Sequence, residues 1–372
     1  MQKCDHLLNF ERHGSLSAAL LLWGWVYVSA FALSFLPKIQ IFRGQWSLES
    51  NAYLGKSFVE RIETLFYHWD TIHYIGLSRD GYQKGSETLA FFPGWPWLLS
   101  LLPQHSRLAQ ALLATLLNFL LMWLFLFVWK KIFERFSKGE HFIYLLMYPT
   151  SVFFVAPYPE SLFLACGGMA VFFALETRTW PLFFSLALFI LTKHAAIVMA
   201  LSIPLWALLF RRKIVAASCA GYAFGAGLIF LFYYRVAGDP LAWLHAQASW
   251  HRHLDHPLTL VLNLQGRATD LVLYLLLLFI APVGLARYAG AAYLRKSFDE
   301  VLVFLYTAAL FVPLWFGSSP QALYRIIVLG TPSLFLLPSF KGYPRRRGAL
   351  MALLLVLNLH CTYRFIAGLR LP

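Results

Sequence analysis

The sequence predicts an all-α polytopic membrane protein, a bundle of about 11 spanning helices. Apolar residues make up 59% of the 372 residues and charged residues only 13%, whereas soluble domains are about 25% charged. Apolar runs recur along the whole chain, many close to the ~20 residues that a helix needs to cross a ~30 Å hydrocarbon core. Helices are the expected spanning form because lipid cannot satisfy the exposed backbone groups of an open sheet.

The first apolar run contains the triplet Ala30-Phe31-Ala32, which has the pattern of a signal-peptide cleavage site. The run continues past this triplet and is too long for a signal-peptide core, so we expect it to remain as the first span. We expect residues 1–372 to form a single transmembrane domain, since no polar segment is large enough to fold alone. The expected spans are 16–36, 108–129, 141–156, 160–176, 180–193, 195–210, 214–234, 269–287, 300–316, 324–338 and 349–366.

The net charge of +14 comes from short basic clusters between the apolar runs. Because these clusters occupy alternate connections, they follow the positive-inside rule and indicate contact with the bilayer rather than with nucleic acid. Placing them in the cytoplasm puts segments 37–107, 157–159, 193–194, 235–268 and 317–323 on the extracytoplasmic side. The clusters contain Lys130, Lys131, Arg135, Lys138, Arg178, Arg211, Arg212, Lys213, Arg287, Arg295, Lys296, Lys341, Arg345, Arg346 and Arg347.

The long outer segment 37–107 carries two expected interfacial elements. Residues 58–79 place apolar and aromatic side chains at helical spacing, which predicts a helix lying on the membrane surface. Residues 89–103 are apolar but contain three prolines and a glycine, and a crossing here would place Lys130 outside. We therefore expect this stretch to form an interfacial or re-entrant helix.

Within this loop, Asp70 and His73 stand one helical turn apart and share a face with Tyr74 and Leu77. A carboxylate beside an imidazole, flanked by aromatic residues at the boundary between lipid and water, is suited to proton abstraction. The alternative is an ordinary solvated acid on an amphipathic helix, with its aromatic neighbours acting as interface anchors. Spacing alone favours that alternative.

Several motifs follow one another along the chain: Trp69-Asp70-x-x-His73-Tyr74, Gly81-Tyr82, Phe91-Phe92-Pro93, Pro149-Thr150-Ser151-x-Phe153-Phe154 and Tyr158-x-Glu160-Ser161-Leu162-Phe163. In residues and in order they resemble the motifs of the PIG-V family. Weaker agreement continues through Gly238-Asp239-Pro240, Gln247-x-x-Trp250 and Tyr324-Arg325, so the resemblance covers about residues 60–335. The family comprises the second mannosyltransferases of glycosylphosphatidylinositol assembly and their prokaryotic relatives.

The resemblance implies a GT-C glycosyltransferase, a multi-span enzyme whose active site lies at the extracytoplasmic membrane face. It implies an inverting transfer of a sugar, foremost mannose, from a polyprenyl phosphate to an acceptor hydroxyl, with Asp70 as general base. Charge that develops on the leaving phosphate calls for nearby cations. The expected substrate-binding residues are His73, Arg79, Glu160, Lys193, His194 and Arg325.

Each of these residues has a simpler interpretation. Lys193 and Arg325 could reach towards lipid headgroups, the histidines could be ordinary interfacial residues, and Glu160 suits the N-terminal dipole of a helix. Lys193-His194 also departs from the family, in which many members have Arg followed by a polar residue and Gly.

No metal and no cofactor are expected, because the Asp-x-Asp pair of metal-using sugar transferases is absent from the sequence. The segment from His251 to His256 contains three histidines, an arginine and an aspartate, and a solvated outer loop is a better interpretation of it than a metal site. The four cysteines are scattered and suggest no disulfide framework.

The sequence leaves the acceptor open: a glycan, a glycolipid or a protein. The chain is short for the eukaryotic enzymes, so we expect a prokaryotic member in the plasma (inner) membrane. The first competing hypothesis is a transporter or flippase for lipid-linked sugars, which predicts inverted repeats and midplane charges that the sequence does not display. The second is a structural subunit of a membrane complex, which rests on aromatic surface alone.

Overall fold

The computed structural model describes residues 15–36, 38–42, 45–49, 56–67, 69–104, 106–136, 144, 147–250, 298–309 and 344–367. Within these ranges the chain is a helical bundle whose core is a continuous cluster of buried apolar and aromatic side chains. Four helices are long and apolar enough to cross a membrane, so the expected polytopic helical membrane protein is confirmed. These four helices are α1 (Ser15–Leu33), α5 (Arg107–Arg135), α11 (Val215–Ala237) and α18 (Pro344–Ile366).

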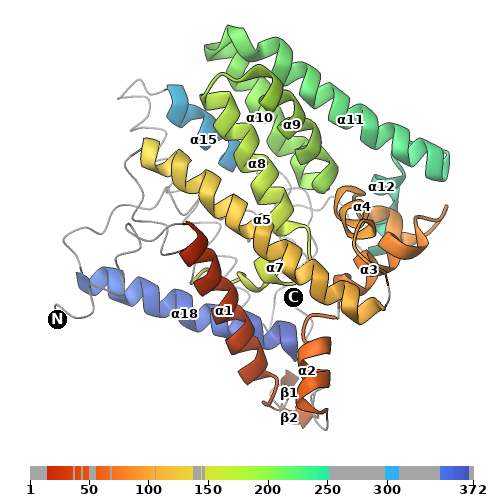
Figure 1. Cartoon of the computed structure of the whole chain (residues 1–372), viewed down its shortest axis with the longest axis vertical. Helices are drawn as coiled ribbons and strands as arrows, with labels where there is room; N and C mark the ends of the chain where they lie inside the picture. Colours follow the sequence, from red (N-terminus) through yellow and green to blue (C-terminus); the bar gives the residue numbers. More distant parts are fainter. Residues whose placement is uncertain are drawn as a thin grey trace.

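Three shorter apolar helices, α8 (Glu160–Leu175), α9 (Thr179–Thr192) and α10 (His194–Phe210), lie beside α5 and α11 (Figure 1). They occupy the positions of three expected spans. Their 14 to 17 residues correspond to about 21 to 26 Å of helix, slightly less than the hydrocarbon thickness. A single extended residue, Lys193, separates α9 from α10.

Glycines allow α11 to approach α9 closely. A Cβ atom on Gly221 would lie 2.7 Å from the carbonyl oxygen of Phe183, and one on Gly225 would lie 3.0 Å from the backbone of Ala187. Small residues at helix contacts of this kind are typical of membrane bundles, where close packing replaces the hydrophobic effect between helices.

The remaining expected spans have mixed outcomes. The span expected at 141–156 is interrupted, because residues 147–151 form turns before the four-residue helix α7 (Val152–Val155). Pro149 within this stretch explains the break, since proline removes a helical hydrogen bond. The span at 300–316 is described as far as Ala309, as α15 (Phe298–Ala309). The spans expected at 269–287 and 324–338 lie outside the described residues.

The single surface helix expected over residues 58–79 is wrong, because the chain forms two helices there, α2 (Phe58–Thr64) and α3 (Asp70–Asp80). The break falls at Trp69, whose φ of 55° is incompatible with a continuous helix. The apolar spacing that predicted one helix persists across the break, but Phe58 and Val59 of α2 are more than 60% exposed, whereas α3 buries Tyr74 and Ile75. Distant contacts to the start of α3, described below, decide where the new helix begins.

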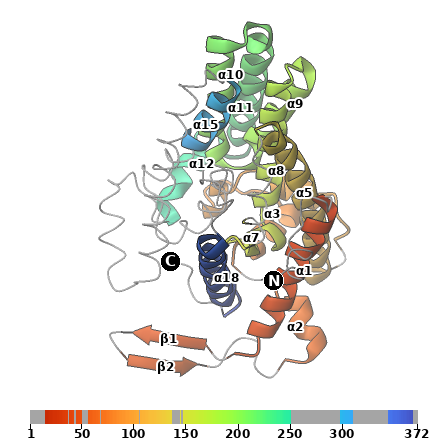
Figure 2. The same cartoon turned by 90° about the vertical axis from the view of Figure 1, so that its left-hand side faces the viewer.

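Residues 89–103 do not cross the membrane as a helix. They include the end of a short 3₁₀ helix, η1 (Glu87–Ala90), and the seven-residue α4 (Gly94–Ser100), which is about 10 Å long. The loop also contains an unexpected antiparallel hairpin of β1 (Lys38–Phe42) and β2 (Gln45–Glu49), which projects away from the helices (Figure 2).

The bundle has two chemically different ends. At one end, Arg135 of α5 pairs with Glu176 at 2.7 Å and with Asp299 of α15 at 2.8 Å, and Asp299 also pairs with Arg211 at 2.7 Å. These ion pairs join the ends of α5, α8 and α10 to the start of α15, so two of the basic clusters lie together. At the other end lie α3, α4 and α12 (Ala242–His245), on the right in Figure 1.

Candidate functional site

The expected general base, Asp70, is the first residue of α3 and is half-buried at the end of the bundle opposite the ion pairs. Its backbone N–H donates to the Tyr158 hydroxyl at 3.1 Å. The preceding Trp69 donates its indole N–H to the carbonyl of Phe365 at 3.2 Å. Segments before α8 and at the end of α18 therefore meet at the start of α3.

His73 lies one turn further along α3, on the face of Asp70 as the sequence predicts. Its ring stacks on Phe91, with centroids 5.4 Å apart and an interplanar angle of 22°. Trp250, at the end of η4 (Ala246–Trp250), meets His73 edge-on at 5.4 Å and donates its indole N–H to the Glu87 carbonyl at 2.9 Å. His73 is thus held against an aromatic wall from two elements distant in sequence.

The wall itself is anchored through the carbonyl oxygen of Phe91. This oxygen accepts two hydrogen bonds of 3.0 Å, one from the Tyr82 hydroxyl and one from the Tyr233 hydroxyl of α11. Burial raises the pKa of Tyr82 well above its usual value, so this side chain remains a neutral donor. The Phe-Phe-Pro motif is therefore fixed through its backbone, which leaves the ring of Phe91 to pack on His73 and Tyr74.

Glu160 and Lys193, expected as separate substrate-binding residues, form an ion pair with each other. Lys193 Nζ lies 2.8 Å from Glu160 Oε1, and both residues are buried, at 7% and 0% exposure. Glu160 is the first residue of α8, and Lys193 precedes α10. A cation at a helix N-terminus is electrostatically unfavourable, and Glu160 offsets that cost.

His194 is half-buried and faces the second phenylalanine of the motif, with its ring 6.3 Å from Phe92. Phe92 also packs on Trp243 of α12 at 5.4 Å. Lys193 and His194 therefore lie at the same end of the bundle as Asp70 and His73.

Arg79 is not brought together with Asp70. Nine residues of helix rotate it to the opposite face of α3, where its guanidinium donates to the Gln104 carbonyl at 2.9 Å. Arg325 lies outside the described residues, as does the histidine-rich segment 251–256. Among the residues that the structure does describe, no three His, Cys, Asp or Glu side chains gather as metal ligands.

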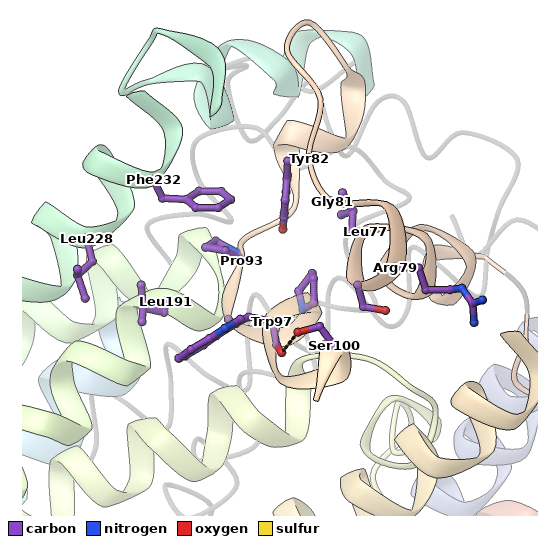
Figure 3. Close-up of a pocket in the computed structure, with 13 residues that line it drawn as sticks. Leu77, Arg79, Gly81, Tyr82, Pro93, Trp97, Ser100, Leu191, Leu228 and Phe232 are labelled. Atoms are coloured by element: carbon purple, nitrogen blue, oxygen red, sulfur yellow. Dashed lines mark hydrogen bonds between the residues drawn. The ribbon is translucent and has the colours of Figure 1, made fainter. Parts of the chain in front are cut away.

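A mainly apolar cavity of about 580 Å³ lies beside the C-terminal half of α3. Figure 3 shows Leu228 and Leu191 on one side of it and Leu77 and Gly81 on the other, while the Arg79 side chain points away. From Asp70 to Ser78, which lines the cavity, α3 rises about 12 Å. The lining residues are Leu77, Ser78, Arg79, Gly81, Tyr82, Pro93, Gly94, Pro96, Trp97, Ser100, Leu191, Leu228 and Phe232.

Three contributors to this end of the bundle were not among the predicted site residues. Tyr158 belongs to the Tyr-x-Glu motif, but nothing in the sequence showed that its hydroxyl would reach Asp70, 88 residues earlier. Phe365 contributes through a backbone carbonyl, for which a sequence contains no side-chain signal. Trp250 is part of the Gln-x-x-Trp motif, which was the available clue to its contact with His73.

The described helices define the class of protein: a helical integral membrane protein. No protein-family model matches the chain, and no curated protein matches it. One solved structure, the Archaeoglobus fulgidus oligosaccharyltransferase in complex with Zn and sulfate, matches with a TM-score of 0.51 at 14% sequence identity. The match covers 94% of this chain and 53% of that chain, so this chain spans about half of its length. A likeness at this identity shows the fold alone.

Proposed function

We propose that the protein is an inverting glycosyltransferase that moves mannose from a polyprenyl phosphate to an acceptor hydroxyl. The observation that carries the proposal is the placement of Asp70. It is half-buried at the start of α3, one turn from His73, whose ring stacks on Phe91, in a chain whose fold resembles that of an oligosaccharyltransferase. The resemblance of the surrounding motifs to the PIG-V family supports mannose as the sugar.

In the proposed reaction, the Asp70 carboxylate accepts the proton of the acceptor hydroxyl as its oxygen attacks the anomeric carbon. The bond between that carbon and the phosphate oxygen breaks, and the polyprenyl phosphate leaves with the electron pair. Attack opposite to the leaving group inverts the configuration at the anomeric carbon. A single carboxylate suffices because the leaving phosphate is already a weak base.

Negative charge grows on the departing phosphate, so cations near it would lower the barrier. His73 and His194 are the described side chains that suit this role by position, since both are half-buried against the Phe-Phe motif. Arg325 is retained as a proposed ligand from the sequence. Lys193 already holds Glu160, so we assign the pair mainly to shaping this end of the bundle.

The cavity beside α3 supports a lipid-linked donor. Its walls include side chains of two bundle helices, Leu191 of α9 and Leu228 and Phe232 of α11, and hydrocarbon chains favour such apolar surroundings. We place the site on the extracytoplasmic face because the basic clusters lie at the opposite end of the bundle. The plasma membrane of a prokaryote is the proposed location.

The test uses purified full-length protein in detergent with radiolabelled polyprenyl-phosphate mannose and a membrane lipid extract as acceptor. The wild type should transfer label, and Asp70→Asn should lose at least ~10²-fold in turnover because it removes the base at constant shape. Asp80→Asn is the matched control, since this carboxylate ends the same helix, is 62% exposed and lies 3.9 Å from Arg107. It should keep the wild-type rate.

Equal rates for Asp70→Asn and the wild type would remove Asp70 from the mechanism. Parallel reactions with other polyprenyl-phosphate sugars and with protein or glycan acceptors assign the substrates. If the wild type transfers no sugar from any of these donors to any of these acceptors, the proposed function is wrong. Net movement of lipid-linked sugar across vesicles would then favour the transporter.

A further inference from the structure

Helix α3 begins without a local cap. The N-cap position is occupied by Trp69, whose side chain makes no capping hydrogen bond. The first N–H groups of a helix have no intrahelical partner and are usually satisfied by a nearby Ser, Thr, Asp or Asn. Here the N–H of Asp70 is satisfied instead by the Tyr158 hydroxyl, from a segment 88 residues away.

The backbone at this point is also strained. Trp69 has a φ of 55°, which a bulky residue adopts only when its surroundings impose it. The hydrogen bond from its indole to Phe365 supplies one such constraint, and the bond from Asp70 to Tyr158 supplies the other. The position of the Asp70 carboxylate therefore depends on tertiary contacts and not on the helical preference of its own segment.

Tyr158 is itself held rigidly. Its ring packs edge-on against Phe153 at 5.2 Å and Tyr74 at 6.0 Å, and its backbone carbonyl accepts a 3.1 Å hydrogen bond from Asn118 of α5. Two residues later, Glu160 is tied to α10 by its buried ion pair. These contacts fix the ring and the backbone of Tyr158, so the position of its hydroxyl is set by the packing of the bundle. The hydrogen bond from Asp70 to this hydroxyl then fixes the start of α3.

We infer that Tyr158 is a positioning residue for Asp70: it fixes the first turn of α3 and thereby the orientation of the Asp70 carboxylate. The inference rests on the proposed function. Its hydroxyl does not itself exchange a proton with substrate. Catalytic groups lose efficiency steeply when displaced, by up to ~10²-fold for a shift of about 1 Å, so loss of this bond should be visible in kcat.

The experiment compares Tyr158→Phe with the wild type in the mannose-transfer assay. The change removes the hydroxyl that accepts the hydrogen bond from the Asp70 N–H and leaves the cavity residues in place. We therefore expect kcat to fall about 10- to 100-fold while KM for the donor stays within about twofold. Tyr306→Phe is the matched control, since this buried tyrosine makes no hydroxyl hydrogen bond within the described residues. It should keep the wild-type kcat.

A double-variant cycle separates positioning from a general structural effect. In an Asp70→Asn background, where the base is already absent, adding Tyr158→Phe should lower the residual rate by less than about twofold. A further fall as large as in the wild-type background would overturn the inference, because Tyr158 would then act independently of Asp70. Trp69→Phe removes the other constraint on α3 and should also lower kcat without raising KM, which provides a second test should Tyr158→Phe misfold.

The two hypotheses fail differently. An active wild type whose kcat is unchanged in Tyr158→Phe rejects the positioning role and leaves the proposed function standing. An inactive wild type rejects both.

Discussion

At the scale of single residues, Lys193 and Glu160 show that the role of a buried charge depends on the side chain that it contacts. Both are almost fully withdrawn from water, and their charged atoms lie 2.8 Å apart. Removing water from two charges is expensive, and their attraction compensates for it only while both partners are present. Each residue alone suggested a substrate contact, because a spacing of 33 residues in sequence does not reveal that they meet.

Glu160→Gln should destabilise the protein by about 3–5 kcal/mol, because it removes the carboxylate that lies 2.8 Å from the buried Lys193 ammonium group. Thermal or denaturant unfolding in detergent measures this loss. The control is Glu176→Gln, whose partner Arg135 is 39% exposed and also contacts Asp299, so the expected loss is about 0–1 kcal/mol. Equal losses in the two variants would show that burial of the pair is energetically unimportant.

The local part of the site was predictable from sequence, and the distant part was not. Asp70 and His73 share a helical face because three residues separate them, a relation that follows from helix geometry alone. The bond between Asp70 and Tyr158 depends on how α3 packs near the start of α8, and no short-range pattern reports that. Arg79 was counted with the site because it is close in sequence, although helical rotation carries it to the opposite face.

At the scale of elements, apolar run length was the reliable signal. The expected runs at 108–129 and 214–234 became α5 and α11, because a helix of that length and composition has no stable alternative in lipid. Amphipathic spacing was weaker evidence. It persisted through residues 58–79 although the chain breaks at Trp69, because apolar spacing does not report the backbone conformation of a single residue.

The packing of α4 on α9 depends on the absence of a side chain at Gly94. A Cβ atom there would lie 2.6 Å from the Leu191 carbonyl oxygen and 2.9 Å from its carbon, so the backbones would have to separate. We expect Gly94→Ala to cost about 1–3 kcal/mol by overpacking, measured by thermal unfolding in detergent.

Gly76→Ala is the matched control, because this glycine lies inside α3 and a Cβ atom there meets nothing within 4 Å. Alanine favours helix over glycine, so this variant should gain about 0.5–1 kcal/mol. We therefore predict that the two substitutions change the free energy of unfolding in opposite directions. A destabilised Gly76→Ala or a neutral Gly94→Ala would contradict it.

At the scale of the whole molecule, the fold places two of the basic clusters and the candidate site at opposite ends of the bundle. The ion pairs of Arg135 and Arg211 close one end of the bundle, and the aromatic wall of Phe91 and Trp250 lies at the other. Alternating basic clusters predicted this polarity, since each span reverses the direction of the chain. The hairpin β1–β2 was not predicted, because short strands in a loop leave little periodic signal.

Cysteine labelling tests how this polarity is oriented in the membrane. In a background with the native cysteines replaced, Lys84→Cys should react with a membrane-impermeant thiol reagent added to intact cells. Arg212→Cys should react only after the cells are opened, because it belongs to a basic connection. Both positions are exposed in the structure. The reverse pattern, or labelling of both from outside, would overturn the proposed orientation.

The hydrogen bond between Trp69 and Phe365 joins segments 296 residues apart, and this separation bears on how the protein is made. A polypeptide leaves the ribosome in order, so the nascent chain contains Asp70 long before α18 arrives to restrain the turn ahead of it. The proposed chemistry of Asp70, which needs a correctly oriented carboxylate, would therefore begin late in biogenesis, once the final described helix has been inserted. A ribosome-bound or prematurely terminated product would occupy the membrane as an inert precursor.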